Sequence, residues 1–235
     1  MALLPKLRQL IKRPVSASTV GVRRPTAGPR RGEAPHEDAL RAMLNDDPNN
    51  IKAFQALVEI VRRRAAETGE TEDPLTAPHP DETYEADRKR RGDLAVWALA
   101  EELAGHPRAW YPLVELARLS LDDDKEGAVR RLATAAERDT SGIALSEAVG
   151  VLREAEMPVD ALGLGLGHWR AREHNPEVGR QLVLAAIEAG RPFEARHHLD
   201  SLGLHPDASA VAAIRTELEP HVKAAEDASP GSVHP

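Results

Sequence analysis

The side chains of this sequence best suited to chemistry are its ten histidines. Histidine binds metals and transfers protons near neutral pH, and zinc enzymes of the HExxH type place two histidines one helical turn apart. No HExxH sequence occurs in this chain. His197 and His198 are adjacent, and His168 and His174 are six residues apart, so the members of each pair point in different directions on a helix. We therefore predict no metal site and no cofactor.

Other catalytic groups also lack a recognisable arrangement. The chain has no cysteine, which excludes disulfides, thiolate catalysis and cysteine-based metal sites. No G-x-S-x-G sequence marks a nucleophilic serine. Three aspartates, residues 122–124, precede a helix expected to start near Lys125, where carboxylates cap a helix and oppose its dipole. We predict that the protein is not an enzyme, with catalysis at an unrecognised site as the alternative.

The stretch LGLGLG, residues 162–167, places three glycines at alternate positions and resembles a dinucleotide-binding loop. That fingerprint needs a strand before the glycines and the start of a helix after them. Here the glycines follow MPVDAL, which is helical in pattern. We interpret Gly163 and Gly167, four apart on one helix face, as positions where a neighbouring helix packs closely.

The elements that position these residues are expected to be helices throughout. Apolar residues make up 41% of the chain but aromatic residues only 3%, so the core must consist mainly of Ala, Leu and Val, which favours packed helices over a β-sandwich. From residue 36 onward the apolar residues recur at helical spacing. The predicted helices cover residues 36–46, 51–67, 81–105, 108–121, 125–138, 141–154, 158–172, 177–189, 192–203 and 207–219.

Two kinds of residue recur at the length of a helix hairpin. Prolines follow predicted helix ends at positions 48, 107, 176 and 206, where they stop one helix and start the next. Alanines at 95, 128, 161 and 195 are spaced 33, 33 and 34 residues apart. The fourth residue after each alanine is Leu99, Leu132, Gly165 or Leu199. A small residue repeated at this point lets one helix approach its neighbour closely.

Residues 49–219 resemble the tetratricopeptide repeat family, in which helix pairs recur about every 34 residues. The residues that match the family pattern, in four degenerate units, are Phe54, Leu57, Ala95, Leu99 and Pro107; Trp110, Leu113, Ala128, Leu132 and Ala135; Ala148, Val151, Ala161 and Pro176; and Val183, Ala195, Leu199 and Pro206. The resemblance implies an all-α solenoid of about four helix hairpins with flanking helices over residues 36–220, interrupted by a polar insertion near residues 65–92. It also implies that Trp110 is buried between helices.

In this family the first helix of each repeat lines a concave groove that binds a partner peptide. The resemblance places ten residues of this chain on the groove: Lys52, Gln55, Glu59, Arg62, Arg108, Tyr111, Glu115, Arg118, Gln181 and Glu188. Glu59 and Glu115 stand where a carboxylate-clamp repeat has Asn, which argues against binding of chaperone tails. The mixed charges suit a partner segment with both signs, and a solvated face without a ligand is the alternative. The expected function is therefore that of a protein-binding adaptor or scaffold.

Residues 1–35 form a basic arm on an acidic body. The arm has one acidic residue, Glu33, and eight basic residues, a net charge of +7, which leaves −14 for the rest of a chain whose total is −7. The basic residues are Lys6, Arg8, Lys12, Arg13, Arg23, Arg24, Arg30 and Arg31. Prolines and glycines between residues 14 and 35 predict disorder, as we also expect for residues 221–235. RNA, the ribosome, an anionic membrane or the protein's own acidic body are the competing partners of the arm.

The location follows from what the sequence lacks. No apolar run is long enough for a transmembrane segment, and charged residues interrupt the apolar positions of the first 14 residues, unlike a secretory signal peptide. Arg far outnumbers Lys, which is typical of GC-rich bacterial genomes. We predict a bacterial cytoplasmic protein, with peripheral membrane attachment through the arm as an alternative.

Overall fold

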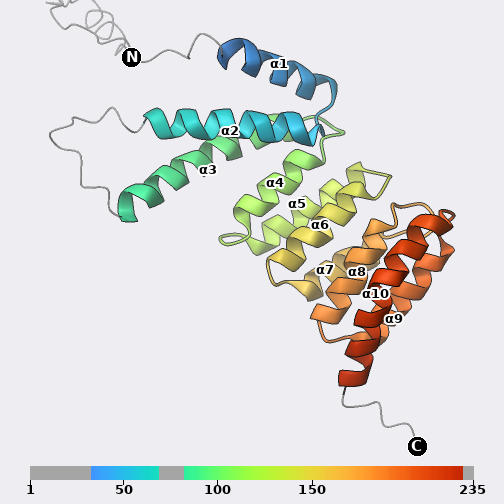
Figure 1. Ribbon diagram of the computed structural model, residues 1–235. Coiled ribbons are helices and arrows are strands. Elements are labelled where there is room, and N and C mark those ends of the chain that lie inside the picture. The colour runs from blue at the N-terminus through green and yellow to red at the C-terminus, as the bar shows by residue number, and fades with distance from the viewer. Residues whose placement is uncertain (1–32, 69–81, 230–235) are drawn as a thin grey trace, which may run out of the picture. The chain divides into compact units, whose positions relative to one another are not determined.

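The computed structural model describes residues 33–68 and 82–229, and within these ranges every regular element is a helix (Figure 1). The described residues from Pro35 onward belong to one compact unit. The elements are α1 (Glu33–Asp46), α2 (Ile51–Thr68), α3 (Glu82–Ala104), α4 (Tyr111–Ser120), α5 (Lys125–Arg138), α6 (Ile143–Glu154), α7 (Pro158–His168), α8 (Glu177–Glu188), α9 (Pro192–Ser201), the 3₁₀ turn η2 (Leu202–Leu204) and α10 (Ala208–Ala228). The predicted all-α class is confirmed for this part of the chain.

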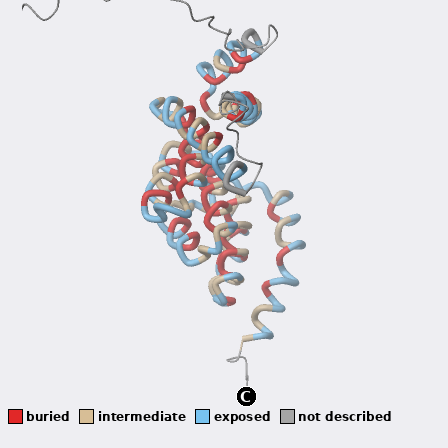
Figure 2. The backbone as a smooth tube through the Cα atoms, turned by 90° about the vertical axis from the view of Figure 1, so that its left-hand side faces the viewer, coloured by how far each residue is buried: buried red, intermediate tan, exposed pale blue. Residues whose placement is uncertain are grey.

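The helices pack as a series of hairpins. Within the series α2 contacts α3, α4 contacts α5, α6 contacts α7 and α8 contacts α9. The second helix of each hairpin also contacts the next first helix, and α4 contacts α6, α6 contacts α8 and α8 contacts α10. Buried residues gather on the helix sides that face one another (Figure 2). Each hairpin therefore buries its apolar face against the adjacent hairpins, since it has too little surface to bury that face alone.

Three of the four repeated alanines lie in the hydrophobic core. Ala128, Ala161 and Ala195 are fully buried, and Ala95 is partly buried. Leu132 and Leu199, one turn further along their helices, are also fully buried. A bulkier side chain at these buried positions would have to displace its packed neighbours, so small residues here permit close packing of the helices.

The glycines of LGLGLG do not pack as predicted. Gly163 and Gly167 are exposed, and a Cβ added at either would meet nothing within 4 Å. A Cβ at Gly165 would instead collide with Leu182 of α8. The close approach of α7 to α8 therefore depends on Gly165. This glycine lies one helical turn after the buried Ala161 and so shares its helix face. All three glycines lie within α7, after a helix rather than a strand, which is not the geometry of a dinucleotide loop.

Trp110 is buried, as predicted, with 8% of its surface exposed. It precedes α4, which begins at Tyr111 rather than at residue 108 as predicted. Its backbone N–H and that of Tyr111 donate to Asn49 Oδ1 at 2.7 and 3.1 Å, and Asn49 Nδ2 donates to the carbonyl of Arg108 at 2.8 Å. The loop before α2 therefore caps a helix that starts some sixty residues later.

The same turn between α3 and α4 is held from its other side by Arg138. Arg138 Nη1 donates to the carbonyl oxygens of Ala104, His106 and Ala109 at 2.9, 3.2 and 2.9 Å. The first of these carbonyls belongs to the last residue of α3, where a cation also interacts favourably with the helix dipole. Two side chains from different hairpins thus fix where α3 ends and α4 begins.

Several predicted boundaries differ from those observed. α10 continues to Ala228, whereas we expected it to end near residue 219 and a disordered tail from residue 221. It continues past the exposed Pro220 because Leu218 and Val222 are both buried, and because Arg196 of α9 pairs with Glu226 at 2.9 Å. The predicted polar insertion, residues 65–92, is helical at both ends, in α2 and α3, and residues 69–81 lie outside the described part.

We predict that Trp110→Ala lowers the free energy of unfolding by about 3–5 kcal/mol, because it leaves a cavity between packed helices. Phe193→Ala is the matched control, since Phe193 is 74% exposed and its loss should change stability by less than about 0.5 kcal/mol. Urea denaturation followed by circular dichroism measures both values. Equal effects of the two substitutions would contradict the packing role of Trp110.

We also predict that stability falls as the pH drops below about 6.5, the pKa of an unperturbed histidine. His198 is 97% buried, its Nδ1 has no hydrogen-bond partner, and its ring lies 5.7 Å from that of Trp169. Burial lowers the pKa of His198. Below about pH 6.5 the unfolded chain is therefore protonated at this residue to a greater extent than the folded chain, which favours unfolding. His174 contributes in the same direction, because burial lowers its pKa too.

Urea denaturation at pH 7.5 and pH 5.5 tests this pH dependence. The loss of stability between the two values should be smaller in His198→Leu than in the parent protein. His197→Leu changes the exposed neighbour, whose charge is a smaller cause of the lowered pKa of His198 than burial is, so it should reduce the loss less than His198→Leu does. A His198→Leu variant with the parent's pH dependence would show that the buried imidazole is not responsible.

Candidate functional site

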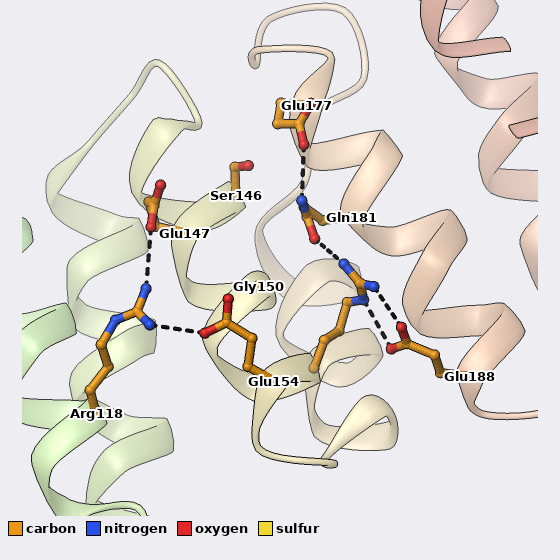
Figure 3. Close-up of a pocket in the computed structure, with 9 residues that line it drawn as sticks. Arg118, Ser146, Glu147, Gly150, Glu154, Glu177, Gln181 and Glu188 are labelled. Carbon is orange, nitrogen blue, oxygen red and sulfur yellow. Dashed lines mark hydrogen bonds and ion pairs between the residues drawn. The ribbon is translucent and has the colours of Figure 1, made fainter. Parts of the chain in front are cut away.

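Two adjoining cavities form a charged groove along α2, α4, α6 and α8. The first has a volume of about 390 Å³ and is lined by Ile51, Gln55, Tyr111, Glu115, Arg118 and Glu147. The second has a volume of about 400 Å³ and is lined by Arg118, Ser146, Glu147, Gly150, Arg153, Glu154, Glu177, Gln181 and Glu188 (Figure 3). Arg118 and Glu147 belong to both, so the two cavities are neighbours, and together they are called the groove below.

The groove is built from one arrangement that occurs twice. Arg118 of α4 donates to two carboxylates of α6, Glu154 at 2.9 Å and Glu147 at 3.5 Å (Figure 3). Arg153 of α6 donates to Glu188 of α8 at 2.9 Å and to the side-chain oxygen of Gln181. We call this series the arginine ladder.

The ladder follows from a sequence register. Arg118 and Arg153 are 35 residues apart, while Glu147 and Gln181, and likewise Glu154 and Glu188, are 34 residues apart. Within each helix the two acceptors are seven residues apart, which places them two turns apart on one face. Each arginine therefore extends to the first helix of the next hairpin and binds it at two points, which are two helical turns apart.

The ladder continues at the α8 end with a different arginine. Gln181 Nε2 donates to Glu177 at 2.9 Å, and Arg180 pairs with Glu177 at 3.0 Å and with Glu217 of α10 at 2.7 Å. The hydrogen bonds that Arg180 donates to Glu217 and Glu177 raise its pKa, so Arg180 stays charged. Charged pairs of this kind join α4 to α6, α6 to α8 and α8 to α10.

The first cavity ends in a neutral phenol. Gln55 Nε2 donates to the hydroxyl of Tyr111 at 3.5 Å. Burial, with the nearby Glu115 carboxylate, raises the pKa of Tyr111 to about 12, so its hydroxyl is protonated at neutral pH. Glu115 in turn lies 3.6 Å from Arg118. This end of the groove offers uncharged hydrogen-bonding groups next to one carboxylate.

Negative charge predominates in the groove. Its lining has five glutamates and two arginines, so its formal net charge is −3. Arg118 and Arg153 already donate to acceptors of the protein itself, whereas each carboxylate retains lone pairs after these bonds. The Glu154 side chain is 70% exposed and that of Glu188 is 41% exposed. The groove is therefore suited to bind cationic groups that donate hydrogen bonds.

Six of the ten residues predicted for the groove line it, and four lie elsewhere. Those in the groove are Gln55, Tyr111, Glu115, Arg118, Gln181 and Glu188. Glu59 and Arg62 instead line a separate hollow against α3, where Arg62 pairs with Asp93 at 3.4 Å, because α2 packs mainly on α3 along this part of its length. Lys52 is exposed on α2, and Arg108 is exposed in the turn before α4.

Sequence reasoning missed every residue that α6 contributes. These residues are Ser146, Glu147, Gly150, Arg153 and Glu154; Glu177 of α8 and Ile51 of α2 were missed as well. The third repeat matches the family pattern weakly, so none of its residues could be assigned to the groove by resemblance. A signal was nevertheless present, because Glu147 and Glu154 have the same seven-residue separation as Gln181 and Glu188.

The remaining predicted features can be placed for the described residues only. Asp124 caps α5 by accepting from the backbone N–H of Gly127 at 2.8 Å, as predicted. Within residues 33–68 and 82–229, no three His, Asp or Glu side chains are grouped so that they could hold a metal ion, and no helix is long and apolar enough to span a membrane. The eight basic residues predicted to bind an anionic partner lie in residues 1–32, outside the described part.

We predict that the arginine ladder contributes modestly and salt-dependently to stability. Arg153→Gln should cost about 1 kcal/mol at low salt and less at high salt, because its side chain is only 18% exposed and binds two groups. Arg130→Gln is the control, since Arg130 and its partner Glu126 are 71% and 92% exposed and their pair should contribute about 0–0.5 kcal/mol. Urea denaturation at two salt concentrations measures both. A salt-independent loss in Arg153→Gln would indicate that its packing matters rather than its charge.

Comparison of the chain with protein-family models, with curated proteins and with solved structures gave no match. The tetratricopeptide resemblance therefore depends on residues of this chain alone. The groove, with its repeated register of arginines and carboxylates, is the feature of the described residues that best supports a functional proposal.

Proposed function

We propose that this protein is a non-catalytic adaptor or scaffold, built of tetratricopeptide-like hairpins, that binds a cationic segment of a partner protein in the groove. The observation that carries the proposal is the surplus of glutamates over arginines on α4, α6 and α8. We favour a cationic segment over one with both signs, because Arg118 and Arg153 are already occupied by carboxylates and an amide of the protein. A positively charged segment meets carboxylates with unused acceptor sites.

The arrangement of the helices supports a binding role. Stacked hairpins place equivalent residues of successive first helices side by side, so they offer a linear partner several similar positions in a row. The register of the arginine ladder has this property, since Glu154 and Glu188 occupy equivalent places on α6 and α8. A partner that contacts both helices gains from two sites at once.

The chemistry of the groove also favours binding over catalysis. An activated nucleophile needs a base within hydrogen-bond reach, or a lowered pKa. Burial and the Glu115 carboxylate raise the pKa of Tyr111, so its phenol is a weaker acid than an exposed tyrosine and is not an activated nucleophile. The alternatives are catalysis at an unrecognised site and RNA or membrane binding through residues 1–35, of which residues 1–32 lie outside the described part.

Affinity purification with quantitative mass spectrometry tests the proposal. The triple variant Glu147→Gln/Glu154→Gln/Glu188→Gln should lower recovery of a groove partner at least about tenfold, since each tenfold loss corresponds to only about 1.4 kcal/mol and three charged contacts are weakened. The matched control Glu101→Gln/Glu137→Gln/Asp160→Asn makes the same charge change at exposed acids outside the groove and should retain the partner.

Deletion of residues 1–32 separates the groove from the arm. Proteins that bind the groove should be recovered equally with and without these residues. If partners are lost when residues 1–32 are deleted but are still recovered with the triple variant, the proposal is wrong and the arm is the binding segment.

A further inference from the structure

We infer that the groove selects an extended segment, close to polyproline II in conformation, with Arg or Lys side chains at positions i and i+3. This inference depends on the proposed function and specifies the partner at the same site. It follows from three properties of the groove: the repetition of its carboxylates, the distance between adjacent helices, and the polar character of its lining.

The carboxylates repeat with the helices. Glu154 and Glu188 are 34 residues apart and occupy the same place in the arginine ladder, each bound by an arginine from the preceding first helix. Both keep exposed side chains. A partner with two cationic groups can therefore contact two equivalent carboxylates, one on α6 and one on α8.

The distance between packed helices sets the spacing of the two cationic groups. Axes of packed helices lie about 8–10 Å apart. A polyproline II segment rises about 3.1 Å per residue and completes a turn in three residues, so its side chains at i and i+3 lie on one face about 9 Å apart. A β-strand places residues i and i+3 on opposite faces, and its i and i+2 positions are only about 7 Å apart. Polyproline II is thus the extended conformation that matches the step between α6 and α8.

An α-helical partner could also match this step, with cationic residues seven positions and about 10.5 Å apart. Helices that dock in grooves do so through apolar anchors, however. Ile51 is the single large apolar residue that lines the groove. Gln55, Tyr111, Ser146 and Gln181 supply uncharged polar groups instead. An extended backbone has free N–H and C=O groups to bind them, whereas the backbone groups of a helix are already paired.

Fluorescence anisotropy with labelled peptides tests the inference on the full chain. Two proline-rich peptides of identical composition carry two arginines, at i and i+3 in one and at adjacent positions in the other. A third, alanine-rich peptide carries them at i and i+7 in a helix-forming background. We expect the i, i+3 peptide to bind about tenfold more tightly than the adjacent-arginine peptide, because only its two side chains reach both carboxylates.

Two variants locate the binding. Glu154→Gln/Glu188→Gln should abolish the advantage of the i, i+3 peptide, while Glu101→Gln/Asp160→Asn, with the same change of charge outside the groove, should preserve it. Circular dichroism checks that both variants remain folded.

The outcomes distinguish this inference from the proposed function. If all peptides bind equally, and Glu154→Gln/Glu188→Gln weakens the binding of each by the same factor, the inferred i, i+3 spacing is wrong. The proposed binding of a cationic segment in the groove would still stand. Tightest binding of the helical peptide would overturn the extended conformation. Binding of all three that is unaffected by both variants would overturn the spacing and count against the groove as the site of cationic binding.

Discussion

The close packing of the helices through small residues is the constraint on which the other features depend. Ala128, Ala161 and Ala195 are fully buried at one repeated position, and Gly165 makes room for Leu182 where α7 meets α8. Because the helices pack closely, each hairpin contacts the next, and α4, α6, α8 and α10 come side by side in chain order. The groove is a consequence of that order, since its lining is drawn from successive first helices rather than from one loop or one helix.

Electrostatics then determines how those first helices can remain adjacent. Glu147, Glu154, Glu177 and Glu188 would repel one another across α6 and α8 without cations between them. Arg118 provides the cation for Glu147 and Glu154 from the preceding first helix, Arg153 does so for Glu188, and Arg180 of α8 itself pairs with Glu177. The interaction leaves the carboxylates only partly neutralised, so the groups that hold the helices together also give the groove its negative charge. Structural and binding roles are thus combined in the same side chains.

The sequence was sufficient to predict the helical class and most helix positions, because apolar periodicity and small residues at hairpin spacing both reflect burial directly. It was less informative about which residues share the groove. The side of α2 on which Glu59 and Arg62 lie is determined by packing against α3, and no local pattern records this. Gly163 and Gly165 likewise differ only in helix rotation, which is set by contact with α8. The extent of α10 depended on Arg196, a residue of another helix, and so could not be read from the residues around Pro220.

The turn between α3 and α4 has a consequence for the order in which the chain assembles. Asn49 holds this turn through the N–H groups of Trp110 and Tyr111, and Arg138 holds it through the carbonyls of Ala104, His106 and Ala109. During synthesis on the ribosome, Asn49 emerges before the turn and Arg138 after it. Asn49 can therefore bind the N–H groups of Trp110 and Tyr111 as soon as α4 appears. The carbonyls must wait for Arg138, the last residue of α5. A nascent chain that pauses between these points has a correctly started α4 but an unsecured end of α3, so the second hairpin becomes fully anchored to the first only when its own last turn has formed.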